Sequence, residues 1–135
     1  MPHVSRRPVE KDVYFQIVDG FYWLLTDLKS EPEMKVFLND FFTKTERIML
    51  AKRLAIALMV MKGYETKIIV EVLRVSSATV YHTQEWLNHG GSGLKMGLNK
   101  LMRQEKLQKF WTKVDRFLEE FVFKPSLLSR IPKNT

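Results

Sequence analysis

The stretch VLRVSSATVYHTQEWL, residues 72–87, starts apolar, carries two serines in the middle and regains helical spacing afterwards. Ser76 or Ser77 can cap a helix, because a serine hydroxyl accepts a hydrogen bond from one of the first free backbone amides. The pattern predicts one helix over about 65–74 and a second that runs to about Asn88. It leaves two interpretations open: a plain helical hairpin, or a helix-turn-helix whose second helix enters the DNA major groove.

A helix-turn-helix needs inward apolar residues that fix the angle between its helices, and these would be Ile69, Leu73, Val75 and Val80. It also needs small or hydrogen-bonding side chains at the start of the second helix, where base edges are read. Arg74 stands at a turn position that glycine often occupies, so the pattern alone does not decide between the two interpretations. The candidate DNA-binding residues in this stretch are Ser76, Ser77, Ala78, Thr79, Tyr81 and His82.

Helical spacing of apolar residues continues on both sides of this stretch, and no segment shows the sustained alternation typical of a strand. Ser30 with Glu33 and Thr43 with Glu46 form capping-box patterns that open two further helices. Gly63 supplies a residue that ends the second of these. We therefore expect an all-α fold.

Composition and helical patterning divide the chain into five expected segments. A basic arm at 1–9 precedes a helical dimerisation and helix-turn-helix domain at 10–88. A Gly-rich hinge at 89–97 connects this domain to an amphipathic helix at 98–123 and a tail at 124–135. The apolar face of the amphipathic helix is expected to pack on Ile68 and Val70, which are more apolar than an exposed helix surface should be.

The charge is uneven along the chain. Its net charge is +7, and residues 91–135 contribute ten basic against four acidic side chains. Such a surplus suits phosphate backbones or acidic partners, although each charge can also be an ordinary solvated one. The candidate phosphate contacts are Arg6 and Arg7 in the arm and Lys106, Lys109, Lys113 and Arg116 on one side of the C-terminal helix.

Several classes of protein are disfavoured. The chain has no cysteine, so disulfides, thiolate catalysis and sulfur-based zinc sites are excluded. Its three histidines are not spaced as metal ligands on one helical face, and there is no phosphate loop or nucleophile elbow. We expect neither an enzyme nor a cofactor. Basic residues interrupt the apolar run at 48–61 and the N-terminus lacks an apolar signal core, so we expect a cytoplasmic chain that makes no membrane contact.

The segment TKTERIMLAKRLAIALMVMKG at 43–63, followed by the helix pair that ends in SSATVYHTQEWL, resembles the Trp-repressor superfamily, in particular its bacterial Trp-repressor-like regulators. The resemblance covers about residues 10–93 and includes the Leu-Asn-His-Gly-Gly run at 87–91. It implies an intertwined helical homodimer that binds double-stranded DNA at the bacterial nucleoid and regulates transcription, as a repressor in the first instance. The residues that match are Thr43, Glu46, Arg47, Leu50, Arg53, Ile56, Gly63, Ala78, Thr79 and Val80.

The same resemblance bears on small-molecule control, because the family's tryptophan effector lies between an arginine of the third helix and one of the recognition helix. Here His82 replaces the second arginine, and Trp86 stands where the effector's indole would need space. We therefore expect that tryptophan is not an effector and that Trp86 packs in its place, which is compatible with Trp86 being an ordinary core residue. The former effector-pocket positions are Thr43, Arg53, His82, Thr83 and Trp86.

Two further expectations follow from the resemblance. Lys67, at the start of the first motif helix, matches a position that contacts DNA. The implied dimer would cover the wide apolar surface of the first helices, and the C-terminal helix is the alternative cover. The rival function for the whole chain is a helical protein–protein adaptor without DNA binding.

Overall fold

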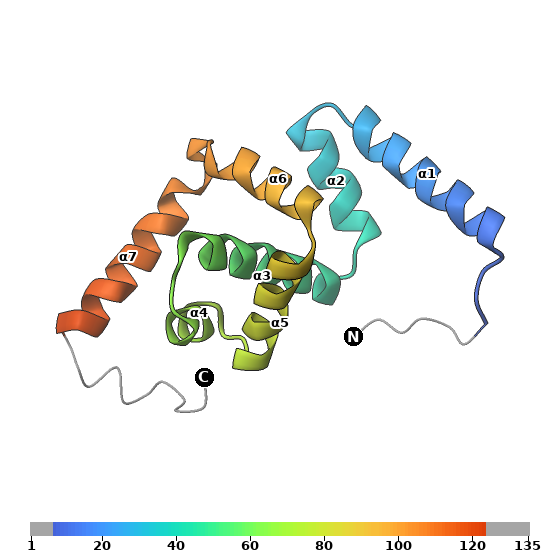
Figure 1. Cartoon of the computed structure of the whole chain (residues 1–135). Coiled ribbons are helices and arrows are strands. Elements are labelled where there is room, and N and C mark those ends of the chain that lie inside the picture. The colour runs from blue at the N-terminus through green and yellow to red at the C-terminus, as the bar shows by residue number, and fades with distance from the viewer. Residues whose placement is uncertain (1–6, 124–135) are drawn as a thin grey trace. The chain divides into compact units, whose positions relative to one another are not determined.

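The computed structural model describes the backbone of residues 7–123 and the side chains of residues 7–120. Over this range it contains seven α-helices, one 3-10 turn and no strand (Figure 1). The prediction of an all-α fold is therefore confirmed. The chain divides into two compact units, Met1–Leu50 and Ala51–Thr135, and each is described by itself.

The first unit contains α1 (Lys11–Asp27), α2 (Glu31–Phe41) and the start of α3 (Lys44–Lys62). The amide of Glu33 donates to the Ser30 hydroxyl over 3.3 Å and so caps α2. At α3 the box is complete: the Glu46 amide donates to the Thr43 hydroxyl at 3.1 Å, and the Thr43 amide donates to the Glu46 carboxylate at 2.8 Å. The capping patterns thus set the starts of both helices, as the sequence predicts.

The apolar faces of α1 and α2 are not buried by their own unit. Neither helix has a buried residue, although Phe21 stacks on Phe41 with ring centres 5.5 Å apart. Trp23 and Val36 are each 66% exposed. So much apolar and aromatic surface on a pair of helices is typical of an interface with another chain.

The second unit contains the rest of α3 and four more α-helices: α4 (Thr66–Leu73), α5 (Ser77–His89), α6 (Ser92–Met102) and α7 (Gln108–Phe123). The 3-10 turn η1 (Glu105–Leu107) lies between α6 and α7. Gly63 has φ +88°, the left-handed conformation that ends α3, as predicted. Figure 1 shows α4 and α5 beside α3, and α7 next to α4 on the side away from α5.

Two adjoining apolar clusters hold this unit together. The first joins α3, α4, α5 and α7 through the buried residues Ile56, Met59, Ile68, Ile69, Val70, Val80 and Val114. The second joins α3, α5 and α6 through Ala57, Leu58, Leu87 and Leu98. The predicted packing of the C-terminal helix on Ile68 and Val70 is confirmed, because both residues are buried in one cluster with Val114 of α7.

The C-terminal half departs from the expected hinge at 89–97 and single helix at 98–123. Only Gly90 and Gly91 separate α5 from α6, and Gly91 takes the left-handed φ of +73°. A second break follows Met102 and ends at η1. A straight helix from 92 to 123 would be about 48 Å long and could not follow both clusters, so the chain turns between them. Apolar spacing alone does not reveal that turn.

No helix in the described part of the chain is both long and apolar enough to cross a membrane.

Candidate nucleic-acid interface

The connection between α4 and α5 has the form of a helix-turn-helix (Figure 1). Arg74 ends α4 in the left-handed conformation, with φ 55° and ψ 54°. This conformation is unfavourable for a residue with a Cβ atom by roughly 1 kcal/mol or more. The Lys52 ammonium of α3 donates to the Arg74 carbonyl at 3.1 Å and the Val75 amide donates to the Val70 carbonyl at 3.3 Å, so hydrogen bonds support the turn in place of a glycine.

The angle between the two helices is fixed by side chains that the sequence places inward. Ile69 of α4 and Val80 of α5 are both fully buried in the first cluster, which confirms their predicted inward position. Leu73 and Val75 are half-buried and pack against the same cluster. α5 is therefore mounted on α4 as a fixed unit.

The serine that caps α5 is Ser76. Its side chain accepts from the Thr79 amide at 3.1 Å, and the two hydroxyls lie 2.8 Å apart. Ser77 is the first helical residue and is half-buried. The capping contacts occupy Ser76 and Thr79, which leaves the later positions of the helix better suited to contact a ligand.

The exposed side of the first turns of α5 brings most of the candidate residues together. Ala78 is exposed, Tyr81 is 57% exposed, and the exposed His82 ring lies 6.3 Å from the Tyr81 ring, edge on. Thr83 points the other way: it is buried, and its hydroxyl donates to the Thr79 carbonyl at 3.2 Å. Lys67 is exposed in the first turn of α4.

Two of the five residues expected at former effector-pocket positions, Arg53 and Trp86, are in contact with each other. The Arg53 guanidinium of α3 lies over the Trp86 ring of α5, 5.9 Å from its centre. Trp86 is 45% exposed, so the expectation of an ordinary core residue is wrong. Thr43, in the first unit, has its hydroxyl engaged in the cap of α3.

The predicted phosphate contacts lie in two places. Arg6 lies outside the described residues, and Arg7 is exposed. Lys109, Lys113 and Arg116 are exposed on α7, and Lys106 is exposed in η1. An open hollow on this side of α7 is lined by Glu105, Lys106, Gln108, Lys109, Thr112, Lys113 and Arg116.

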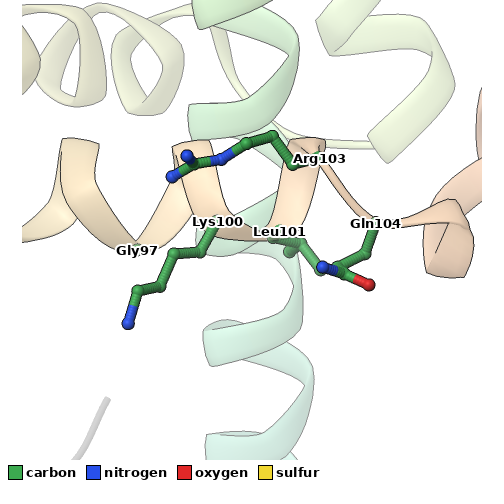
Figure 2. Close-up of a pocket in the computed structure, with 5 residues that line it drawn as sticks. All are labelled: Gly97, Lys100, Leu101, Arg103 and Gln104. Atoms are coloured by element: carbon green, nitrogen blue, oxygen red, sulfur yellow. The ribbon is translucent and has the colours of Figure 1, made fainter.

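A second hollow, at the end of α6, also carries basic side chains (Figure 2). Lys100 and Arg103 line it with Gly97, Leu101 and Gln104. It is open to solvent, and the Arg103 side chain is already hydrogen-bonded to the Asn99 carbonyl at 3.2 Å. This hollow does not enclose a small molecule as an effector pocket would.

The sequence did not single out Lys52, Tyr64 or Asp115. Lys52 supports the turn, and the Tyr64 hydroxyl donates to the Asp115 carboxylate of α7 at 3.2 Å. Burial, followed by the nearby Asp115 charge, raises the pKa of Tyr64. Both contacts join residues far apart in the chain. Of the two, only the Lys52 contact had a signal in the sequence. Arg74 stands at a turn position where glycine is common, and an arginine in the left-handed conformation needs support from a neighbour.

Comparison with known families agrees with this geometry. A family model described as Trp repressor protein matches residues 16–104, well over half of the chain. A search of curated proteins and a search of solved structures each found no match. The matched range extends past the resemblance seen in the sequence and takes in α6, whereas α7 lies beyond it. The matched family is one of helix-turn-helix DNA-binding regulators rather than enzymes.

Proposed function

The chain belongs to the Trp repressor family, and from this premise we propose that it is a sequence-specific transcriptional regulator that binds double-stranded DNA as a homodimer and represses. The observation that carries the proposal is the exposed start of α5, mounted on α4 by the buried Ile69 and Val80. A helix presented in this way fits the major groove. The proposal also places the protein in the bacterial cytoplasm, at the nucleoid.

The side chains at this surface have the chemistry of DNA contacts. The Tyr81 hydroxyl and the His82 ring nitrogens can donate or accept hydrogen bonds at base edges, and Ala78 can contact a thymine methyl group. The α5 N-terminus offers backbone amides to a phosphate. Lys67 supplies a positive charge for a phosphate or a guanine.

The homodimer is supported by the uncovered surface of the first unit. Trp23, Tyr22 and Ile17 of α1 are at least 60% exposed, and α2 adds Val36. The C-terminal helix, which was the alternative cover, already has its apolar face in the first cluster of the second unit. We therefore propose a second copy of the chain as the partner, and a two-fold dimer would read two half-sites about one helical turn of DNA apart.

We also propose that the regulator does not respond to tryptophan. In support, Arg53 lies over the chain's own Trp86 ring, and the exposed His82 cannot replace the always-charged guanidinium of an arginine. The Trp86 indole then occupies the place of a free effector. The helix-turn-helix formed by α4 and α5, which we call the reading head, then needs no ligand to bind DNA.

A gel-shift titration with mixed genomic duplex at two salt concentrations tests the DNA-binding role. We expect binding that weakens steeply with salt, since phosphate contacts release counterions. The double variant Lys67→Ala, Tyr81→Ala should weaken binding by tenfold or more, because two proposed contacts near the groove are removed, each worth roughly 1 kcal/mol or more. The matched control Lys95→Ala, Met96→Ala removes a lysine and a large side chain from exposed positions of α6 and should bind as the parent does.

The adaptor alternative makes the opposite prediction for the same titration. If salt-sensitive DNA binding is absent, the DNA-binding proposal is rejected and the adaptor role is favoured. Selection from a random duplex library should return a two-fold symmetric site. Placing that site across a reporter promoter should lower expression, and a rise would reject the repressor assignment.

A further inference from the structure

α7 has two unlike faces, and it lies outside the range that the family model matches. Over the described side chains, one face packs within the protein: Val114 is 1% exposed in the first cluster, and Phe110, Trp111, Phe117 and Leu118 pack against that cluster. The other face carries the basic side chains. The sequence of α7 therefore combines a packing role with a solvent-facing charged surface.

The basic face consists of Lys109, Lys113 and Arg116, which are three and four residues apart and so lie on one side of the helix. All three are exposed. Among the described residues, none of the three forms an ion pair. Their charges are thus uncompensated within the described part of the chain. Glu120 follows on the same side one turn later and ends the basic face.

α7 is fixed to the second unit at more than one point. The Lys62 ammonium lies over the Trp111 ring, 4.1 Å from its centre, and Tyr64 stacks on Trp111 with an angle of 6° between the rings. The Tyr64–Asp115 hydrogen bond adds a polar tie. Because α7 packs on α4, its basic face keeps a defined position relative to the helix-turn-helix.

We propose that the basic face of α7 is a second DNA-binding surface, which binds backbone phosphates of the duplex that flanks the site read by α5. This inference rests on the proposed function. Lys109 and Arg116 are about 10 Å apart along the helix axis, a length over which duplex DNA presents several phosphates. A double helix supplies such a regular row of negative charge on every sequence, so these contacts add affinity without adding base specificity.

The test is the salt dependence of DNA binding by the full chain and by the variant Lys109→Gln, Lys113→Gln, Arg116→Gln, with mixed genomic duplex as the probe. The slope of log affinity against log salt should fall by about 0.9 for each phosphate that the variant no longer neutralises, hence by up to about 2.7 per subunit. Affinity at low salt should fall tenfold or more. The matched control Lys29→Gln, Lys44→Gln, Lys95→Gln removes the same charge from exposed lysines outside α7 and should keep the parent slope.

A second test removes a negative charge and leaves all three basic side chains in place. Glu120→Gln removes the carboxylate at the end of the basic face and should raise affinity severalfold at low salt. If the triple variant and its control bind alike, or if Glu120→Gln leaves affinity unchanged, the inference is overturned while the DNA-binding role stands. If the full chain shows no salt-sensitive DNA binding, the proposed function and this inference are both rejected.

Discussion

The Arg53 guanidinium lies 5.9 Å from the centre of the Trp86 ring and so links α3 to α5. Arg53 lies on α3 and Trp86 on α5, the second helix of the helix-turn-helix. A cation–π contact on a half-exposed ring contributes roughly 0.5–1 kcal/mol. In the proposed ligand-independent regulator, the Trp86 indole supplies a contact that an added ligand could otherwise make.

The first prediction concerns that contact. Trp86→Ala should lower both the free energy of unfolding and the affinity for DNA. A double-mutant cycle with Arg53→Met should give a coupling energy of about 0.5–1 kcal/mol in urea unfolding. Free indole at millimolar concentration should restore part of the DNA affinity of Trp86→Ala and have no effect on the parent. A coupling energy near zero would mean that the two side chains are only neighbours.

Tryptophan itself should not bind the parent protein. Under the proposed function, the Trp86 ring takes the Arg53 face that a free indole would need. Isothermal titration calorimetry should therefore show no saturable heat, and DNA affinity should be the same with and without tryptophan. Micromolar binding would contradict the proposal that the reading head works without this ligand.

The core of the helix-turn-helix gives the next prediction. Ile69→Ala should lower the free energy of unfolding by about 2–5 kcal/mol, because it removes apolar contacts and leaves a cavity in a fully buried site. Urea unfolding followed by circular dichroism measures the destabilisation. Met96→Ala, at a position 61% exposed on α6, is the control and should change stability by less than about 0.5 kcal/mol. Equal effects of the two changes would contradict the packing described for α4 and α5.

Parts of this fold follow from local rules and parts do not. The cap of α3 and the inward positions of Ile69 and Val80 could be predicted, since each depends on residues within one helix or one turn. The choice between Ser76 and Ser77 could not, because two adjacent serines satisfy the same capping rule. Burial of Val80 on α4 sets the helix register and so selects Ser76.

The C-terminal region shows the same limit over a longer range. Apolar spacing continues from α6 into α7, and only the positions of the two clusters decide where the chain turns. Trp86 is a related case, because an aromatic residue at helical spacing predicts burial, whereas Trp86 is 45% exposed and in contact with Arg53 of another helix. Contacts of this kind join residues far apart in the chain and cannot be predicted from the pattern of one segment.

The cap of α5 provides a prediction about the serine pair. Ser76→Ala should lower the free energy of unfolding by about 1 kcal/mol, whereas Ser76→Gly should cost only about a few tenths of a kcal/mol, since glycine leaves the N-terminal amides open to water. Thermal unfolding by circular dichroism distinguishes them. If neither variant lowers the free energy of unfolding, the Ser76 hydroxyl does not act as the cap.

The Glu46 carboxylate makes stability depend on pH at the start of α3. Hydrogen bonds from Thr43, first from its amide and then from its hydroxyl, lower the pKa of Glu46 in the folded state. A lowered folded pKa means that the ionised form is preferred in the fold. Its contribution is therefore present above the ordinary glutamate pKa of about 4.3 and is lost as the pH falls through the lower, folded value.

Glu46→Gln should accordingly lower the melting temperature at pH 7, and the difference from the parent should shrink steadily as the pH falls below about 4. Thermal unfolding at a series of pH values measures this. Glu119→Gln, at an exposed position of α7, corrects for the removal of one negative charge from a basic chain. A Glu46→Gln difference that stays constant down to the lowest pH would show that the carboxylate charge has no part in the cap.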